Sequence, residues 1–409
     1  MPKLFQINVC NNLYSSGKIV SAIGELAIEN GWESFIAYSR DYAPSLNKSI
    51  RIGGLFDVCL NAIEQRIFDN TGFGIGSYLP TIRLIQKIDE IKPDIIHLHV
   101  ISGYYLHYTI LFNYLSELNI PIVWTLHSCW EITGHCTHFD YVGCAKWKSE
   151  CYDCPLRKEY PQSYVFDRSR ENYRQKKTLF NSLKNLHLVA VSKWLGEVVA
   201  QSYFKDKPLN VIYNGVDLNT FYPSEKNIAL LKKNNLIGKF IAVGLASTWL
   251  PKKGLNDYFE LAKILPEDFR IIMIGLSKKQ IGQLPYNITG IEKTIDVNEL
   301  RDIYSLADVV LNLSYEESFG LTTVEGMACG TPSIVYNKTA SPELVSEETG
   351  FVVKAGDIDG VLRCMKIIKE RGKDIFSHHC RQRALTYFDK NKNFSKYIEL
   401  YEKLINSSI

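Results

Sequence analysis

The stretch Ser-Tyr-Glu-Glu-Ser-Phe-Gly-Leu-Thr-Thr-Val-Glu-Gly-Met-Ala-Cys-Gly-Thr-Pro, residues 314–332, decides the fold of this chain. An apolar run at residues 307–313 precedes it, and residues 332–336 are typical of a second short buried strand. The middle of the stretch is long enough for two to three helical turns, which Gly330 can end. The pattern therefore predicts a strand–helix–strand unit of a parallel sheet. Such sheets bind ligands beside the loop that leaves the strand, here residues 317–320.

The start of the predicted helix suits an anion. Backbone N–H groups at a helix start attract phosphate, and Gly320 lets a ligand approach the main chain. Glu317 and Glu325 would lie on either side of that anion. Backbone amides can bind a diphosphate, and the two carboxylates can accept hydrogen bonds from ribose and hexose hydroxyls. This combination suits a sugar nucleotide. The alternative is that both glutamates are solvated charges at a helix end, with Glu317 serving the helix dipole.

The Glu-x7-Glu pattern, with Phe-Gly-Leu inside it and Gly-Thr-Pro after it, resembles group 1 (family 4) glycosyltransferases of GT-B fold. The resemblance covers nearly the whole chain and implies a retaining hexosyltransferase that needs no metal or other cofactor for catalysis. It implies a UDP- or GDP-sugar donor and an α/β architecture of two doubly wound, Rossmann-like domains facing across a cleft. Strand and helix patterns alternate throughout the chain, which also favours two such domains.

Length and composition set the domain plan. A chain of 409 residues is more than one core normally serves. We expect an acceptor-side domain over residues 1–205 with a Cys-rich insert at about 128–165. A nucleotide-sugar domain should follow over 206–385, and a helix over 386–409 should cross back to the first domain.

Charge and hydropathy exclude several function classes. A net charge of +3 gives no reason to expect nucleic acid as a partner. The start of the chain reads as a short strand and not as a signal peptide. No run approaches the ~18 apolar residues of a membrane span. We therefore expect a cytoplasmic protein whose cysteines are reduced.

The loop after the first strand of the second domain should hold the diphosphate. The family pattern places an arginine after this strand and a lysine before the following glycine. Lys253 fits the lysine, whereas Ser247 stands where the arginine belongs, so Lys252 is the expected substitute. Trp249 either stacks on the base or forms a hydrophobic lid. The expected donor-binding residues are Gly17, Ser247, Trp249, Lys252, Lys253, Glu317, Ser318, Phe319, Gly320, Leu321 and Glu325, and the expected catalytic residues are His127, Lys253 and Glu317.

The first domain should supply the acceptor side. His97 and His99 face one side of a strand end that Tyr104 follows. The resemblance implies that this element, with all three residues, lines the acceptor side. The two histidines are either hydrogen-bonded or metal ligands. His127 is the donor-sugar contact that the resemblance implies, although Ser128 replaces the aspartate common in the family. The turn before a helix that should start at about Gly17 is either a phosphate or acceptor contact or an ordinary strand–helix turn.

The insert carries Cys136, Cys144, Cys151 and Cys154. Four thiols with one Cys-x2-Cys pair favour a structural zinc ion, in which His135 or His138 could replace one thiolate. The alternative is four small buried side chains in a long loop. The insert resembles a branch of bacterial capsule and exopolysaccharide (colanic-acid-type) glycosyltransferases with a similar Thr-Gly-His-Cys segment.

Residues 146–184 hold ten Lys or Arg against five Asp or Glu, with aromatics between them. Such a surface could make peripheral contact with the inner membrane, although a helix packed on the sheet is favoured slightly. The expected acceptor is a saccharide or a lipid-linked saccharide. Rival functions are a non-catalytic sugar-nucleotide-binding partner of a glycan assembly complex, a same-fold epimerase and, weakly, a glycoside hydrolase.

Overall fold

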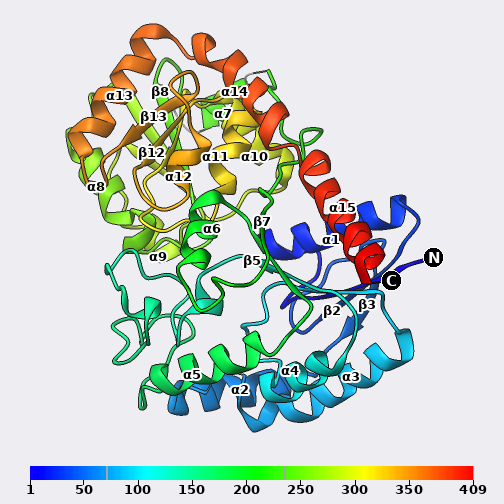
Figure 1. Cartoon of the computed structure of the whole chain (residues 1–409). Coiled ribbons are helices and arrows are strands. Elements are labelled where there is room, and N and C mark those ends of the chain that lie inside the picture. The colour runs from blue at the N-terminus through cyan, green and yellow to red at the C-terminus, as the bar shows by residue number, and fades with distance from the viewer. Residues whose placement is uncertain (71, 226, 234–235, 409) are drawn as a thin grey trace. The chain divides into compact units, whose positions relative to one another are not determined.

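The computed structural model describes residues 1–70, 72–225, 227–233 and 236–408 (Figure 1). The chain forms two compact units, Met1–Ile212 with Phe394–Ile409, and Tyr213–Asn393. Both divisions fall several residues beyond the expected boundaries at 205 and 385. The reason is that β7 (Leu209–Val211) pairs with β6 (Leu186–Ala190), and residues from Phe394 onward pack in the first core.

The first unit is built on a seven-stranded parallel sheet in the order β3-β2-β1-β4-β5-β6-β7. Its other strands are β1 (Lys3–Ile7), β2 (Glu33–Tyr38), β3 (Lys48–Arg51), β4 (Ile95–Leu98) and β5 (Ile122–Leu126). Its helices are α1 (Tyr14–Glu29), α2 (Leu55–Phe68), α3 (Tyr78–Ile91), α4 (Tyr108–Glu117), α5 (Ser169–Asn181) and α6 (Lys193–Ala200), with short turns η1 (Ile75–Ser77), η2 (Trp130–Ile132) and η3 (Lys146–Lys148). Strands β4 and β5 are buried along their whole length, as their continuous apolar sequences require.

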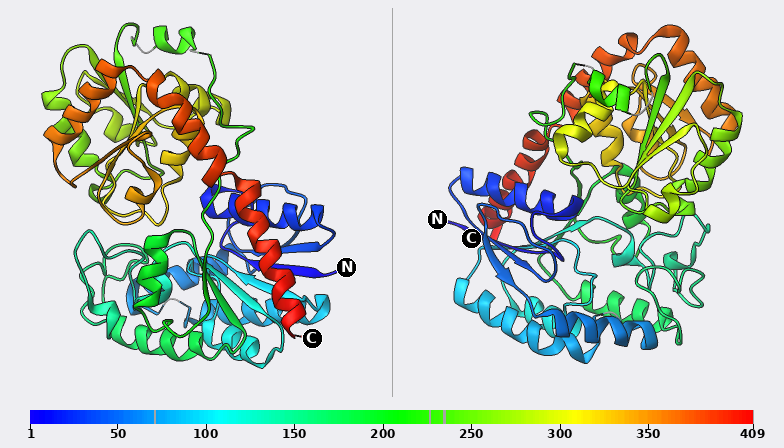
Figure 2. Two further views of the ribbon diagram at one scale, coloured as in Figure 1. Left: turned by 45° about the horizontal axis from the view of Figure 1, so that its top comes forward. Right: turned by 180° about the vertical axis from the view of Figure 1, so that it is seen from behind.

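The last helix, α15 (Lys390–Ser408), completes the core of the first unit. Its side chains Phe394, Tyr397 and Tyr401 are buried in one cluster with Ile19 and Ile23 of α1, beside which α15 runs in Figure 2. The helix therefore crosses back to the first sheet, as the GT-B fold requires.

The second unit contains a six-stranded parallel sheet in the order β10-β9-β8-β11-β12-β13. Its strands are β8 (Phe240–Leu245), β9 (Phe269–Ile274), β10 (Ile288–Ile291), β11 (Val309–Asn312), β12 (Ser333–Tyr336) and β13 (Gly350–Val353). Its helices are α7 (Ile228–Lys233), α8 (Leu255–Ile264), α9 (Lys278–Ile281), α10 (Val297–Leu306), α11 (Leu321–Ala328), α12 (Ser341–Leu344), α13 (Ile358–Arg371) and α14 (Asp374–Tyr387), with the turn η4 (Pro251–Lys253). The predicted strand–helix–strand unit is β11–α11–β12, with the helix in the middle of the stretch as predicted.

Two further features concern the rest of the chain. The insert at residues 128–165 has no regular structure beyond η2 and η3. Among the helices of the described residues, none is long and apolar enough to pass through a bilayer.

Candidate active site

The loops that follow β8 and β11 meet at the carboxyl edge of the second sheet. These strands are neighbours and the chain winds away from them in opposite directions, which makes this the switch point where such sheets bind ligands. Gly254 before α8 and Gly320 before α11 have φ values of +78° and +102°, which favour glycine. A Cβ on Gly254 would lie 2.3 Å from the Leu313 carbonyl oxygen, so the two loops pack backbone against backbone. Two helix N-termini therefore open at one edge of the sheet.

The lysines of one loop pair with the glutamates of the other. Lys253 Nζ lies 2.7 Å from Glu317 Oε1 and donates to the Glu316 carbonyl at 2.9 Å. Lys252 Nζ lies 3.7 Å from Glu316 Oε2. The structure thus brings Lys252, Lys253 and Glu317 together and adds the buried Glu316. Glu316 was not predicted, although its position directly before Glu317 in the sequence could have indicated it.

Glu325 projects from α11 and is oriented by Tyr304 of α10. The Tyr304 hydroxyl donates to Glu325 Oε2 at 3.0 Å. Burial and the neighbouring Glu325 charge raise the pKa of Tyr304 well above its ordinary value, so the phenol remains a donor. No pattern in the sequence singled out Tyr304.

Two predicted donor contacts do not present their rings at the surface. Trp249 is 4% exposed, and its Nε1 donates to the Ile274 carbonyl at 2.8 Å while its ring packs on Tyr258. The expectation that Trp249 stacks on a base is therefore corrected, because its ring belongs to the core. Phe319 is also buried and has only its backbone N–H to offer. Among the other members of the set, Ser247 is exposed, Ser318 and Leu321 are half-buried, and Gly17 and Gly320 are buried.

The histidines of the first unit form a buried cluster. His97 hydrogen-bonds through Nε2 to Thr125 Oγ1 (2.8 Å) and through Nδ1 to the Tyr401 hydroxyl of α15 (2.6 Å). His99 Nδ1 lies 3.1 Å from His127 Nε2. His97 and His99 are fully buried, which corrects their expected place on an acceptor surface and favours the hydrogen-bonded alternative.

His127 is the partly buried member of this cluster. Burial lowers the pKa of His127 to about 4 and the pKa values of His97 and His99 well below their ordinary range. All three rings are therefore neutral at pH 7. The donor-sugar contact of His127 stays a prediction.

Helix α1 begins at Tyr14, three residues before the expected start at Gly17. A Cβ on Gly17 would lie 3.0 Å from Cys10 Sγ, so this glycine allows α1 to pack closely on the preceding loop. Tyr104 is half-buried, and its ring contacts the guanidinium of Arg40 at 5.3 Å. Arg40 was missed, although its place directly after a strand, at the ligand-binding edge of the predicted sheet, could have indicated it.

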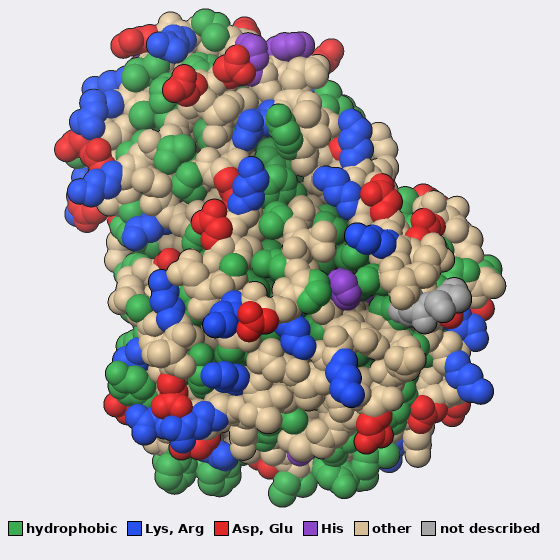
Figure 3. Space-filling view, in the orientation of Figure 1, with side chains coloured by type: hydrophobic (Ala, Val, Ile, Leu, Met, Phe, Trp, Pro, Cys, Tyr) green, Lys and Arg blue, Asp and Glu red, His purple; other side chains and the backbone are tan. Residues whose placement is uncertain are grey.

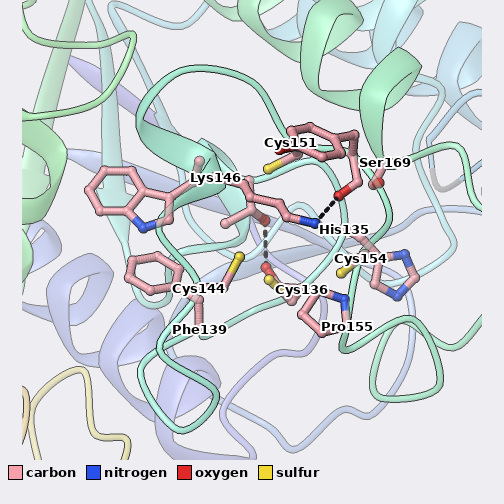
Figure 4. Close-up of a pocket in the computed structure, with 12 residues that line it drawn as sticks. His135, Cys136, Phe139, Cys144, Lys146, Cys151, Cys154, Pro155 and Ser169 are labelled. Carbon is pink, nitrogen blue, oxygen red and sulfur yellow. Dashed lines mark hydrogen bonds between the residues drawn. The ribbon is translucent and has the colours of Figure 1, made fainter.

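The insert gathers its cysteines around one small cavity of about 10 Å³ (Figure 4). Cys136, Cys144, Cys151, Cys154 and His135 all line this cavity. A hydrogen bond from the Cys136 thiol lowers the pKa of Cys154 to about 7. Within the part of the chain that the structure describes, no three His, Cys, Asp or Glu side chains already form a metal-binding group.

Two doubly wound parallel sheets, with lysines, carboxylates and helix N-termini at one switch point, define a protein of GT-B type. A family model described as "Glycosyl transferases group 1" matches residues 228–385, and one described as "Glycosyltransferase Family 4" matches residues 26–220. The chain therefore belongs to the group 1, family 4 glycosyltransferases, which confirms the resemblance seen in the sequence.

Individual relatives and solved structures are similar at low identity. The chain is 22% identical over 353 residues to WcaC of Escherichia coli K12, a protein assigned to colanic acid biosynthesis as a glycosyl transferase; the alignment covers 83% of this chain and 82% of WcaC. Sucrose-phosphate synthase from Thermosynechococcus elongatus superposes over 100% of both chains with a TM-score of 0.72 and 17% identity. Anabaena HepE in complex with UDP and glucose gives a TM-score of 0.70 and 16% identity over 99% of this chain and 100% of HepE. The structural likeness confirms the GT-B fold.

Proposed function

We propose that this protein moves a hexosyl unit, with retention of configuration, from a nucleoside diphosphate sugar to a saccharide acceptor in cell-surface polysaccharide synthesis. The observation that carries the proposal is the meeting of Lys253 and Glu317 at two helix N-termini. The UDP complex of HepE supports the donor class, and the assigned role of WcaC supports the biological setting.

The proposed chemistry needs no metal. Departure of the diphosphate builds negative charge on the leaving phosphate and positive character on the sugar. Lys253 and the backbone N–H groups of residues 319–321 are placed to stabilise that negative charge where it develops. In this proposal, Glu317 accepts hydrogen bonds from hydroxyls of the sugar, and Glu325 accepts them from the ribose hydroxyls. The leaving phosphate takes the proton of the acceptor hydroxyl, as the family resemblance implies.

The ion pair between Lys253 and Glu317 prepares this site before a donor arrives. It holds the ammonium group at the mouth of both helices, so less side-chain ordering remains when the diphosphate binds. The phosphate then takes over part of the carboxylate's role as hydrogen-bond acceptor, and Glu317 becomes free to turn toward the sugar.

A panel of UDP- and GDP-sugars, screened by thermal shift and then by release of nucleoside diphosphate, tests the proposal. We expect one donor to stabilise the protein, and Lys253→Ala with Glu317→Gln to remove turnover. Lys263→Ala, which breaks an exposed ion pair with Glu260, is the matched control. Conversion of the donor to its epimer without an acceptor would favour an epimerase. Donor binding with neither transfer nor slow hydrolysis would favour a non-catalytic partner.

We also propose that the first unit rests on an anionic membrane, which brings a lipid-linked acceptor within reach. Helix α2 buries the polar Asn61 and Gln65 and exposes apolar side chains, which is the reverse of an ordinary surface helix. The exposed apolar face comprises Leu55, Phe56, Ile63, Ile67, Phe68, Ile75, Tyr78, Leu79, Tyr164, Val165 and Phe166. Figure 3 shows apolar side chains along its lower edge, over the region of α2 and α5 in Figure 1, with Lys and Arg side chains nearby.

The charges of this face suit anionic lipid. Asp57 accepts a hydrogen bond from the Gly54 N–H, and Glu64 accepts them from the N–H groups of Ile75 and Gly76, so both carboxylates are engaged by backbone. Arg66 on the same helix is exposed. The predicted basic surface at 146–184 contributes only in part, because Tyr173, Phe180 and Leu183 are buried.

Sedimentation with vesicles tests this contact. We expect binding to vesicles that contain phosphatidylglycerol and weaker binding to pure phosphatidylcholine. Phe56→Asp with Ile63→Asp should abolish it, whereas Tyr286→Asp, at an exposed position of the second unit, should not. If the double substitution instead converts a dimer to a monomer and leaves vesicle binding unchanged, the face is a subunit interface and the membrane proposal is wrong.

A further inference from the structure

The insert at residues 128–165 is held together by little regular structure. It contains two short 3₁₀ turns and one small aromatic contact, Phe139 against Trp147 at 4.8 Å between ring centroids. Small irregular segments without a sizeable core are usually fastened by disulfides or a metal ion. Its five cysteines are free thiols, and four of them, Cys136, Cys144, Cys151 and Cys154, line a common cavity.

His135 supplies the observation that separates a metal site from a cluster of buried thiols. This ring lines the same cavity, is 2% exposed, and its Nε2 is buried with no hydrogen-bond partner. A buried ring nitrogen left without a hydrogen-bond partner is destabilising unless something binds it. On the other side of the ring, Nδ1 lies 2.6 Å from Asp69 Oδ1. A carboxylate on one ring nitrogen is the usual partner of a histidine whose other nitrogen binds a metal.

Asp69 is itself firmly placed. Its Oδ1 accepts from Gln65 Nε2 at 2.8 Å, and its Oδ2 accepts from the Arg168 N–H at 2.9 Å. This network fixes the tautomer of His135 with the proton on Nδ1. The free lone pair is then on Nε2, as zinc coordination requires.

We propose that the insert binds one structural zinc ion through His135 Nε2 and the thiolates of Cys136, Cys151 and Cys154. Cys136 and Cys154 are already in hydrogen-bond contact. The Cys151 sulfur accepts the N–H of Gly134 at 3.2 Å, a contact that suits a thiolate. Cys144 also lines the cavity, but a tetrahedral site takes four ligands, and the contacts given above favour the other three sulfurs. His138 does not line the cavity and is left outside the set.

The charge of such a site is compatible with its surroundings. Three thiolates, a neutral imidazole and Zn²⁺ carry a net charge of −1. The buried ammonium group of Lys176 donates to the carbonyls of Trp130 and Thr133, directly beside the segment that carries His135. Burial lowers the pKa of Lys176 to about 7, and a negatively charged site beside it would favour the protonated form, which offsets the negative charge.

Binding must still draw the ligands together, because the donors do not yet form a metal-binding group. Rotation about the single χ1 of a cysteine moves its sulfur by about 3 Å, so the cysteines can approach His135 Nε2 by changing rotamer. Each thiol gives its proton to solvent as its sulfur binds zinc, so affinity should rise with pH.

Metal analysis of the full chain, purified without chelators or a metal-affinity column, tests the proposal. We expect about one zinc per chain and a lower unfolding temperature after removal with a strong chelator. Cobalt substitution should give the intense visible bands of a tetrahedral thiolate site, a readout independent of activity. Cys154→Ser and His135→Ala should lose the metal. Cys59→Ser, exposed on α2, and Cys129→Ser, buried in the insert but outside the cavity, should keep it.

The cobalt spectrum of the unaltered chain decides the matter if a variant fails to fold. Absence of both bound zinc and the cobalt bands would overturn the proposal, as would a mass two hydrogens lower that maps to a Cys136–Cys154 disulfide. Loss of zinc in Cys144→Ser with retention in His135→Ala would show that the ligand set is wrong.

Discussion

Replacing Lys253 by alanine should slow glycosyl transfer far more than it lowers stability. In the ligand-free protein, its ammonium group pairs with Glu317, and the two side chains are 29% and 20% exposed. An ion pair of this kind is worth about 0.2–1 kcal/mol, which is the expected loss in the free energy of unfolding. In the transition state the same group faces growing phosphate charge, where one such donor is worth about 2.7–4 kcal/mol. We therefore expect kcat to fall by about 10²–10³-fold.

The assay is release of nucleoside diphosphate at saturating donor and acceptor, beside urea unfolding and calorimetric titration of the free nucleotide. Affinity for the nucleotide should change less than turnover, because the leaving-group charge grows only as the bond breaks. Lys263→Ala removes an exposed ion pair of the same unit and should leave turnover unchanged. Full turnover in Lys253→Ala would place the diphosphate site elsewhere and refute the reasoning.

Three further predictions concern neighbouring groups. Glu325→Ala should weaken binding of free nucleoside diphosphate by about 1.5–3 kcal/mol, measured by calorimetry; unchanged affinity in a folded variant would remove Glu325 from the site. Lys252→Ala should lower kcat less than Lys253→Ala does, and adding Ser247→Arg should make that loss disappear; a double variant as slow as Lys252→Ala would contradict the compensation. Because burial holds the pKa of His127 near 4 and unfolding returns it to about 6.5, the unfolded chain binds more protons between these values. The free energy of unfolding should therefore fall as pH is lowered from 6.5 toward 4, and His127→Asn should flatten this dependence in urea titrations at pH 7.5 and 5; an unchanged slope would refute it.

The central strands could be read from the sequence because they are buried on both faces. The predominantly apolar residues 95–98 and 122–126 predict two strands, and β4 and β5 have these bounds. Strands β3 and β7 were missed because they are short edge strands whose side chains are largely exposed. Helix α2 was missed for another reason, since its buried face is polar and its apolar residues face outward. A pattern that assumes an apolar core side cannot detect such a helix.

Local sequence order explains which site residues could be predicted. Lys253 and Glu317 follow strand ends that are adjacent in a parallel sheet, so the motif itself implies that they meet. The burial of His97 depends on Tyr401, 304 positions away, and no local pattern reports such a contact. For Trp249, the sequence left stacking on the base or a hydrophobic lid as alternatives, whereas the ring packs against Tyr258 in the core.

The return of α15 makes the first unit discontinuous in sequence, and this reverses the order in which the two units can mature during translation. Strands β1, β4 and β5 emerge early, yet the cluster that covers them includes Tyr397 and Tyr401. Until those residues leave the ribosome, the polar edges of His97 and Thr125 lack their tyrosine partners. The second unit, continuous from Tyr213 to Asn393, has no such dependence. The half of the protein that is made first is therefore the half that finishes folding last.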